Sequence, residues 1–356
     1  MSSEISNKGR VPARLAPIFV PRIWGARNLS PLFPEHSQEV EPIGEVWLTG
    51  DACAFASGEF AGRTLGEVWP FLPEEWTGTS LRGLPHIPLL VKFIFPEEKL
   101  SVQVHPDDAY AERHESAAGG VGKTEIWYVI SARPEAAVRV GLNPNVTRES
   151  FQRAVADGTV ENCLGSVAVR AGDAVFVPAG TTHTICPGVV LCEIQQHSDI
   201  TYRVFDYNRV AADGKPRALH LRQALNVMQF GEQSGGLCEP VRITRDAVTE
   251  TFYAACRYFA AERWEFRERI AAATSPEHFD LLIFLEGKGR MEFAGGAESF
   301  GPAEVWLLPA ALGAYQLLPD SPTTLLRAYV PDLAGFAQRL SDEHIAEAQW
   351  SRVVHP

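Results

Sequence analysis

The segment 99–108, KLSVQVHPDD, contains two residues of types that often bind metal ions, Gln103 and His105, two positions apart. Alternate residues of a β-strand share a face, so one face of this segment would carry Lys99, Ser101, Gln103 and His105. The amide oxygen of Gln103 and the imidazole of His105 suit adjacent positions on one metal ion. A polar face exposed to water explains the segment equally well, so the choice depends on the rest of the chain.

Two further segments supply a carboxylate and a second imidazole. Lys123, Glu125 and Trp127 share a face of the strand predicted in GKTEIWYVI, and a carboxylate in so apolar a run is costly to bury unless it is paired or metal-bound. His183 follows a short predicted strand, and a lone histidine there is more often structural. Together, however, the donors form a mixed nitrogen and oxygen set suited to Zn²⁺ or another divalent first-row ion: Gln103, His105, Glu125 and His183. Since water or substrate oxygens would complete the coordination shell, the predicted site is catalytic.

Arg203 is a further candidate for chemistry. It lies between Tyr202 and Val204 in the predicted strand 201–205, where a solvated arginine is less expected than one turned into a polar pocket. The alternative is that Arg203 pairs with Asp199 or Asp206 and braces the strand.

These segments resemble those of type I mannose-6-phosphate isomerases (phosphomannose isomerases) of the compact bacterial kind, which belong to the cupin superfamily. The matching stretches fall in family order and cover roughly residues 15–230: PRIWG at 21–25, GEVWL at 44–48, LVKF at 90–93, LSVQVHPDD at 100–108, KTE at 123–125, PAGTTH at 178–183 and SDITYRVFDYNR at 198–209. The combination of the Q-x-H-P-D-D and S-D-x-T-Y-R-x-x-D segments is much more specific than a generic cupin signature.

The resemblance implies roles for these residues. It makes Gln103, His105, Glu125 and His183 the zinc ligands, the set that the strand faces also favour, and it makes Arg203 the catalytic arginine. It associates the substrate pocket and its phosphate with Lys92, Ser101 and Lys123. The chain departs from the family in two places. It has Lys123-Thr124-Glu125 where the family often has K-P-E, and its helical insert is reduced to about 140–165.

The implied reaction interconverts mannose 6-phosphate and fructose 6-phosphate through a cis-enediol. Arginine does not deprotonate near neutral pH, so Arg203 is expected to stabilise the enediolate and orient the substrate rather than act as a base. The sequence leaves the general base open between Lys123, a metal-bound hydroxide and a carboxylate near the metal. Two other functions remain open: another metal-dependent cupin enzyme such as a dioxygenase, and a non-catalytic sugar-phosphate-binding regulator.

The elements that must position these residues are predicted to be short strands. The 25 prolines and 29 glycines interrupt the chain often, and short β-like runs favour strands at 100–104, 125–130, 174–177, 189–194 and 201–205. Several of these runs alternate in polarity at period two, which is typical of half-buried strands. Helices are predicted after the N-cap Thr147, at 219–228, and at 333–340 with 344–349. The fold class predicted is therefore mainly β: two cupin-like β-barrel (jelly-roll) modules with a few helical inserts.

A weak internal repeat supports two modules. The segment 172–183, ending in His183, matches 301–314 in outline, with Ala314 in the place of His183, and 281–293 is predicted to be a hairpin. The predicted domains are a catalytic cupin over 1–235, with the insert near 140–165, and a degenerate cupin-like domain over 241–356. The linker predicted between them is GEQSGGLCEP at 231–240.

Composition limits the partners. The 356 residues suggest about two domains at roughly 150 residues each. The formal net charge of −12 argues against nucleic acid or an anionic membrane, so an anionic sugar phosphate requires local positive charge. No signal-peptide core follows the N-terminus, and the longest apolar run, 87–95, is far too short to span a membrane. Six scattered cysteines without a C-x-x-C pair predict a reduced, cytoplasmic protein.

Overall fold

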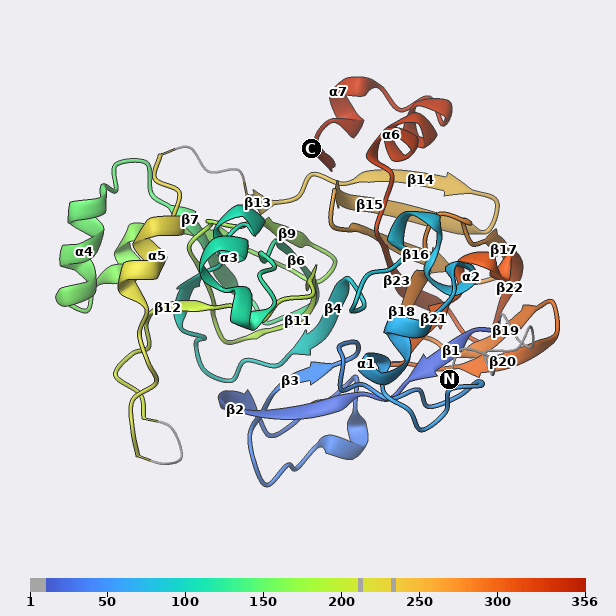
Figure 1. Cartoon of the computed structure of the whole chain (residues 1–356), viewed down its shortest axis with the longest axis horizontal. Coiled ribbons are helices and arrows are strands. Elements are labelled where there is room, and N and C mark those ends of the chain that lie inside the picture. The colour runs from blue at the N-terminus through green and yellow to red at the C-terminus, as the bar shows by residue number, and fades with distance from the viewer. Residues whose placement is uncertain (1–10, 211–213, 232–234) are drawn as a thin grey trace.

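The computed structural model describes residues 11–210, 214–231 and 235–356. The fold is mainly β, as predicted, and the two halves of the chain lie side by side (Figure 1). Part of the predicted linker, at 232–234, and the first ten residues of the predicted first domain lie outside the described residues.

Two antiparallel sheets form the first half. In spatial order, the first contains β13 (Gly236–Leu237), β9 (Ala174–Val177), β6 (Glu125–Ala132), β11 (Val189–Gln196), β4 (Leu89–Ile94), β3 (Ile43–Trp47) and β2 (Ile18–Ala26). The second contains β12 (Tyr202–Phe205), β5 (Val102–Val104), β10 (His183–Ile185), β7 (Ala137–Leu142) and β8 (Leu164–Ala168). One apolar cluster joins the sheets, with Trp127 and Val129 from the first and Val138 and Ile185 from the second. The two sheets therefore pack face to face.

Two further sheets form the second half. The larger contains β1 (Ala13–Leu15), β21 (Val305–Leu308), β18 (Asp280–Glu286), β23 (Thr323–Tyr329), β16 (Ala260–Phe266), β15 (Val248–Cys256) and β14 (Val241–Arg245), and β24 (Val354–His355) pairs with β15. The smaller contains β17 (Ile270–Ala273), β22 (Ala314–Pro319), β19 (Gly289–Phe293) and β20 (Gly296–Phe300).

The helices are short (Figure 1). They are α1 (Leu65–Val68), α2 (Glu74–Thr77), α3 (Asp108–His114), α4 (Arg148–Ala156), α5 (Leu221–Val227), α6 (Leu333–Asp342) and α7 (Glu347–Trp350). Single 3₁₀ turns are η1 (Pro34–His36), η2 (Trp69–Phe71), η3 (Thr79–Leu81), η4 (Ser116–Ala118), η5 (Val160–Cys163) and η6 (Ala310–Leu312). The N-cap predicted at Thr147 is confirmed, because its side chain accepts a hydrogen bond from the backbone N–H of Ser150. Helix α7 begins three residues later than predicted, at Glu347.

The hairpin predicted at 281–293 is wrong. Strand β18 pairs with β21 and β23, whereas β19 pairs with β20 and β22 in the other sheet. Gly287 lies between the two strands with φ +86°, a conformation that other residues rarely adopt. The chain therefore crosses from one sheet to the other at Gly287 instead of folding back on itself.

The outline of the predicted repeat agrees with the structure. Strand β9 ends at Val177 before Pro178, and β10 begins at His183. Strand β21 ends at Leu308 before a proline, and β22 begins at Ala314. Ala314 thus has the place in β22 that His183 has in β10.

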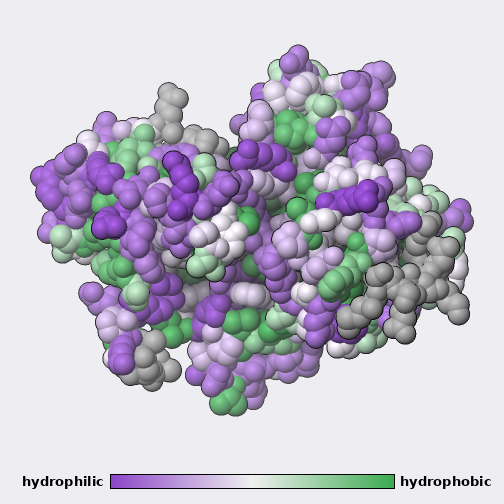
Figure 2. Space-filling model, viewed as in Figure 1, coloured by the Kyte–Doolittle hydropathy of each residue, from purple (hydrophilic) through white to green (hydrophobic). Residues whose placement is uncertain are grey.

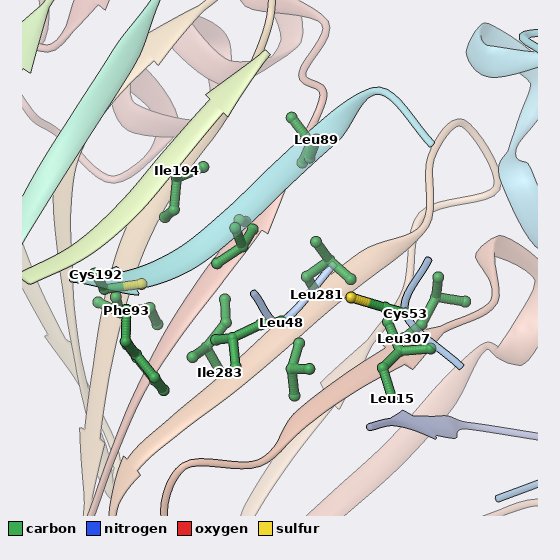
Figure 3. Close-up of a cluster of buried hydrophobic side chains, with 14 of the residues drawn as sticks. Leu15, Leu48, Cys53, Leu89, Phe93, Cys192, Ile194, Leu281, Ile283 and Leu307 are labelled. Atoms are coloured by element: carbon green, nitrogen blue, oxygen red, sulfur yellow. The ribbon is translucent and has the colours of Figure 1, made fainter. Parts of the chain in front are cut away.

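An apolar core runs across both halves. Figure 3 shows Leu48 and Phe93 of the first half packed in one cluster with Leu281 and Ile283 of the second. The N-terminal strand β1 also pairs with β21, so the start of the chain completes a sheet of the second half. The division at 235 and 241 stays a prediction.

The surface face in Figure 2 is largely hydrophilic, with scattered apolar residues. Among the described residues, no helix combines the length and the apolar character needed to cross a bilayer.

Candidate metal and substrate site

The four predicted donors converge between the two sheets of the first half. Gln103 of β5 and His183 of β10 lie directly opposite each other in register. Glu125 begins β6 in the other sheet, where it lies opposite Val177. His105 follows the last residue of β5, and its carbonyl oxygen accepts a hydrogen bond from the backbone N–H of Gly180 in the loop before His183.

The distances between donor atoms fit one bound ion. Nε2 of His183 lies 3.2 Å from the amide nitrogen of Gln103 and 3.5 Å from Oε1 of Glu125, and Nε2 of His105 lies 3.6 Å from Oε2 of Glu125. Ligands in a tetrahedral zinc site are separated by about 3.4 Å, given metal–ligand distances of about 2.1 Å. A half-turn of the Gln103 amide presents its oxygen to the same point. His105, Glu125 and His183 are each 1% exposed, so no water layer competes for them.

Hydrogen bonds orient both imidazoles. Nδ1 of His105 donates to the carbonyl oxygen of Ile200 at 2.8 Å, and Nδ1 of His183 donates to that of Thr181 at 2.9 Å. Each ring therefore presents the lone pair of Nε2 to the cluster, as metal-binding histidines do. Burial lowers the pKa of His183 to about 4 and holds that of His105 well below its ordinary value, and the Lys123 ammonium contributes to both shifts. Both rings are thus neutral, the form that binds metal.

Lys123 lies against this cluster. Its Nζ forms an ion pair with Glu125 and lies 3.3 Å from Nε2 of His105 and 3.4 Å from Oε1 of Glu193. Burial alone would lower the pKa of the Lys123 ammonium, but the carboxylates of Glu125 and Glu193 outweigh burial and raise that pKa. Lys123 is therefore a buried cation beside the donor cluster.

A cavity of about 410 Å³ opens next to the cluster. The predicted substrate-binding residues Lys92, Ser101 and Lys123 and the predicted catalytic residue Arg203 all line it. The other lining residues are Arg22, Trp24, Glu45, Ile94, Leu100, Gln103, Glu193, Asp199, Thr201 and Arg217. Its lining carries five basic and three acidic side chains. This surplus of positive charge in a chain of net charge −12 is the local excess that an anionic substrate requires.

Arg203 does not make the bracing ion pairs considered from the sequence. Asp206 pairs with Arg209 and Arg217, and Asp199 pairs with Lys92. Nη1 of Arg203 donates to the carbonyl oxygen of Ala218, while Nε is buried and has no hydrogen-bond partner among the described residues. Burial and the adjacent Arg217 lower the pKa of the Arg203 guanidinium.

Two carboxylates in the cavity were not predicted. Glu193 is 6% exposed and lies near Lys123 and Lys92, and burial raises its pKa despite these cations. Glu45 pairs with Arg22 and Lys92. Both lie in apolar strand segments, VVLCEIQQ and IGEVW, so the signal that singled out Glu125 was also present at these two residues.

Lys99 does not share the cavity face, contrary to the alternation assumed for 99–105. Its Nζ pairs with Glu161 at 2.8 Å. Strand β5 is regular only over Val102–Val104, so the alternation does not extend back to Lys99.

Comparison with known proteins adds relatives along most of the chain. No family model matches the sequence. The probable mannose-6-phosphate isomerase GmuF of Bacillus subtilis is 33% identical over 313 residues, which cover 86% of this chain and 96% of the relative. The mannose-6-phosphate isomerase of Streptococcus mutans is 31% identical and covers 83% of this chain and 91% of its own length.

Comparison with solved structures also finds mannose 6-phosphate isomerases. The crystal structure of mannose 6-phosphate isomerase from Bacillus subtilis superimposes with a TM-score of 0.81 at 29% identity, covering 89% of this chain and 99% of that one. A putative mannosephosphate isomerase from Archaeoglobus fulgidus has a TM-score of 0.70 at 15% identity, covering 89% and 98%, and shows likeness of fold alone.

Proposed function

The chain belongs to the mannose-6-phosphate isomerase family, and on that premise we propose that it interconverts mannose 6-phosphate and fructose 6-phosphate. The observation that carries this proposal is the cavity that joins a four-donor cluster to Lys92, Lys123 and Arg203. A donor cluster alone is compatible with many cupin reactions, whereas basic side chains around it suit a phosphorylated substrate.

We propose Zn²⁺, with other divalent ions possible, as the cofactor held by Gln103, His105, Glu125 and His183. When bound, the ion supplies Lewis-acid stabilisation of negative charge on the sugar oxygens. The short separations of these donors and the hydrogen bonds from both Nδ1 atoms to backbone carbonyls support this ligand set.

Isomerisation requires that a proton move between C1 and C2 of the sugar. Lys123 and Glu193 are the candidates beside the donor cluster that are not ligands. The adjacent carboxylates hold Lys123 protonated, so it suits electrostatic stabilisation better than proton abstraction. Burial raises the pKa of Glu193, and a carboxylate with a raised pKa is a stronger proton acceptor, so we favour Glu193 as the base.

Arg203 is proposed to stabilise the charge that develops on the enediolate. Its guanidinium lines the cavity and makes no ion pair with Asp199 or Asp206, whose carboxylates pair with other cations, so its charge is available to the substrate. Lys92 and Ser101, with Lys123, are proposed to bind the phosphate-bearing substrate, and their buried positions on the cavity wall support this role.

The finer description of the fold is also a proposal: two cupin-like jelly-roll modules over 1–235 and 241–356. The matching places of His183 and Ala314 after their prolines support it. A cytoplasmic location, and the lack of nucleic-acid and membrane partners, stay predictions from charge and cysteine pattern.

A coupled assay that follows fructose 6-phosphate formation from mannose 6-phosphate tests the function. Turnover that depends on a divalent ion supports the proposal. Oxygen consumption without isomerisation identifies a cupin dioxygenase, and tight binding of sugar phosphate without turnover identifies a regulator; either result overturns the proposal.

A further inference from the structure

We propose that Asp51, His86 and His197 form a second divalent-cation site, separate from the substrate cavity. None of the three residues lines that cavity or belongs to the donor cluster of His105, Glu125 and His183. Two imidazoles and one carboxylate form a donor set suited to Zn²⁺ and similar first-row ions.

The sheet order brings these residues together. Strand β4 lies between β3 and β11 and is antiparallel to both, so the ends of β3 and β11 lie beside the beginning of β4. Asp51 follows β3, His86 precedes β4, and His197 is the residue directly after β11. Three segments far apart in the sequence therefore each place one donor at the same edge of the sheet.

The donor atoms are close enough for one ion. Nδ1 of His86 lies 2.7 Å from Oδ2 of Asp51, and Nε2 of His197 lies 3.7 Å from Oδ1 of the same carboxylate. The imidazoles of His86 and His197 stack with ring centroids 5.4 Å apart. One donor atom from each residue lies within 4.8 Å of the other two. Small side-chain rotations bring this set to the separations of a zinc site, about 3.4 Å.

One atom of the cluster lacks a partner that an ion would supply. Oδ1 of Asp51 is buried and accepts no hydrogen bond from any described residue, and the nearby Nε2 of His197 is too distant to donate one. A buried carboxylate oxygen without a partner is costly, and metal coordination removes that cost.

The backbone holds the three segments in place. The hydroxyl of Thr49 donates to the carbonyl oxygen of Leu89 and accepts from the N–H of Val91, both at 2.8 Å. The N–H of His197 donates to the carbonyl oxygen of Pro88, and the carbonyl oxygen of Asp51 accepts from Gly66. The three donor residues thus belong to backbone segments that hydrogen bonds hold together, and this lowers the entropy cost of binding an ion.

The three protein donors leave positions for water, and the side chains of His86 and Asp51 are 54% and 42% exposed, so the ion can exchange with solvent. An ion at this place would tie together the ends of β3, β4 and β11, the strands that carry Glu45, Lys92 and Glu193. The site is therefore expected to stabilise the scaffold of the cavity without entering the reaction.

The experiment counts ions. The full chain is stripped with a chelator, equilibrated by dialysis with a small excess of Zn²⁺, and analysed by mass spectrometry for zinc per chain. Wild type is compared with His86→Gln and Asp51→Asn, and with His344→Gln, which removes an exposed histidine outside the cluster. We expect His86→Gln and Asp51→Asn each to hold one ion fewer than wild type, and His344→Gln to hold the wild-type number.

The difference of one ion is independent of whether the substrate-side donors bind zinc, so failure here is distinguishable from failure of the proposed function. The same ion content in wild type, His86→Gln and Asp51→Asn would overturn the second site. An equal loss in His344→Gln would also overturn it, because it would show adventitious binding to surface histidines. Unfolding temperatures of the stripped proteins check that each variant is folded; Zn²⁺ should raise that of wild type more than that of His86→Gln.

Discussion

Glu125 and Asp280 occupy matching places in two strand pairs. Glu125 lies opposite Val177, the last residue of β9, and Asp280 lies opposite Leu308, the last residue of β21. Their surroundings differ. Glu125 lies beside two imidazoles, whereas both carboxylate oxygens of Asp280 accept from Nη2 of Arg327 at 3.0 Å. The same strand position thus carries a carboxylate beside two imidazoles in the first half and a carboxylate bound by an arginine in the second.

The neighbouring strands repeat this contrast. Lys92 lies opposite Glu193 in the first half, and Glu262 lies opposite Arg327 in the second, with the two charges exchanged. Arg327 is also 3.4 Å from Glu262, which in turn accepts hydrogen bonds from Tyr329 and Arg339. Because these buried charges pair with one another, the second half is expected to contribute stability rather than chemistry.

Chelation is expected to abolish isomerase activity while the fold is retained, because the proposed ligands lie in sheets that have their own apolar core. Activity before and after chelation, and after addition of Zn²⁺, is measured together with circular dichroism. A fully active metal-free protein would contradict the metal assignment, and global unfolding would identify a structural ion instead.

The His183→Ala variant is expected to lose both bound metal and turnover. It removes one of four proposed donors, and the loss of a ligand weakens metal affinity by orders of magnitude. The matched control is Ala314→Ser, at the corresponding start of β22, which should keep wild-type activity. Wild-type metal content in His183→Ala would show that the ligand set is wrong.

The ion pair of the second half should matter for stability alone. Asp280→Asn leaves the guanidinium of Arg327 with a weaker set of buried partners and should lower the free energy of unfolding by about 3 kcal/mol. The control is Glu292→Gln, which breaks the half-exposed ion pair with Arg290. This variant should change the free energy of unfolding by less than about 1 kcal/mol. Urea denaturation measures both values. A large loss of kcat in folded Asp280→Asn would contradict a purely structural role.

Glu45 should make the free energy of unfolding depend on pH in the acid range. Burial would raise its pKa, but Lys92 and Arg22 lower it from 4.5 to about 2. Because the folded-state pKa is depressed, the stabilisation is full above about pH 4.5 and is lost as the pH falls toward 2, amounting to roughly 3 kcal/mol in all. The free energy of unfolding of wild type and Glu45→Gln should therefore converge across this range. Parallel curves for the two proteins would show that Glu45 is not the titrating group.

Local patterns predicted much of the fold. Short β-like runs, several of them alternating at period two, located β6, β9, β11 and β12, and the cap at Thr147 located α4, because these signals depend on neighbouring residues. The pairing of β1 with β21 joins residues nearly the whole chain apart and leaves no local signal. The false hairpin at 281–293 arose because a glycine turn between two strands looks the same whether the chain folds back or changes sheet.

Local sequence patterns predicted only part of the candidate site as well. Alternation placed Gln103 on one strand face with His105, and Glu125 on one face with Lys123 and Trp127, and the structure brings Gln103 and Glu125 beside His105 and His183. Glu193 lies in an apolar strand segment, as Glu125 does, so its own segment carried a signal that was not used. Its pairing with Lys92 and Lys123, by contrast, joins different strands and leaves no local signal. The roles of these residues stay predictions until variants are assayed.

Variants of Arg203 distinguish a catalytic role from a bracing role most clearly. If its guanidinium stabilises charge that develops only in the transition state, Arg203→Ala should lower kcat by roughly 10²–10³, or about 3–4 kcal/mol, as for an oxyanion-hole donor. Substrate affinity should fall less, because a ground-state hydroxyl gains little from the cation. Metal content should not change. Arg203→Lys should restore only part of the rate, because a point charge lacks the planar fork.

The contacts of Arg203 make the contrary outcome measurable. The side chain of Arg203 donates to the carbonyl oxygen of Ala218, while its backbone N–H donates to Nδ1 of His220 and its carbonyl oxygen accepts from the backbone N–H of His220. A bracing role would therefore act through the segment 218–220. In that case Arg203→Ala lowers the melting temperature and leaves kcat of the folded enzyme within a few-fold of wild type. Arg209→Ala, which removes a neighbouring arginine that pairs with Asp206, provides the comparison for general loss of charge. A similar fall in kcat in both variants would remove Arg203 from the catalytic residues.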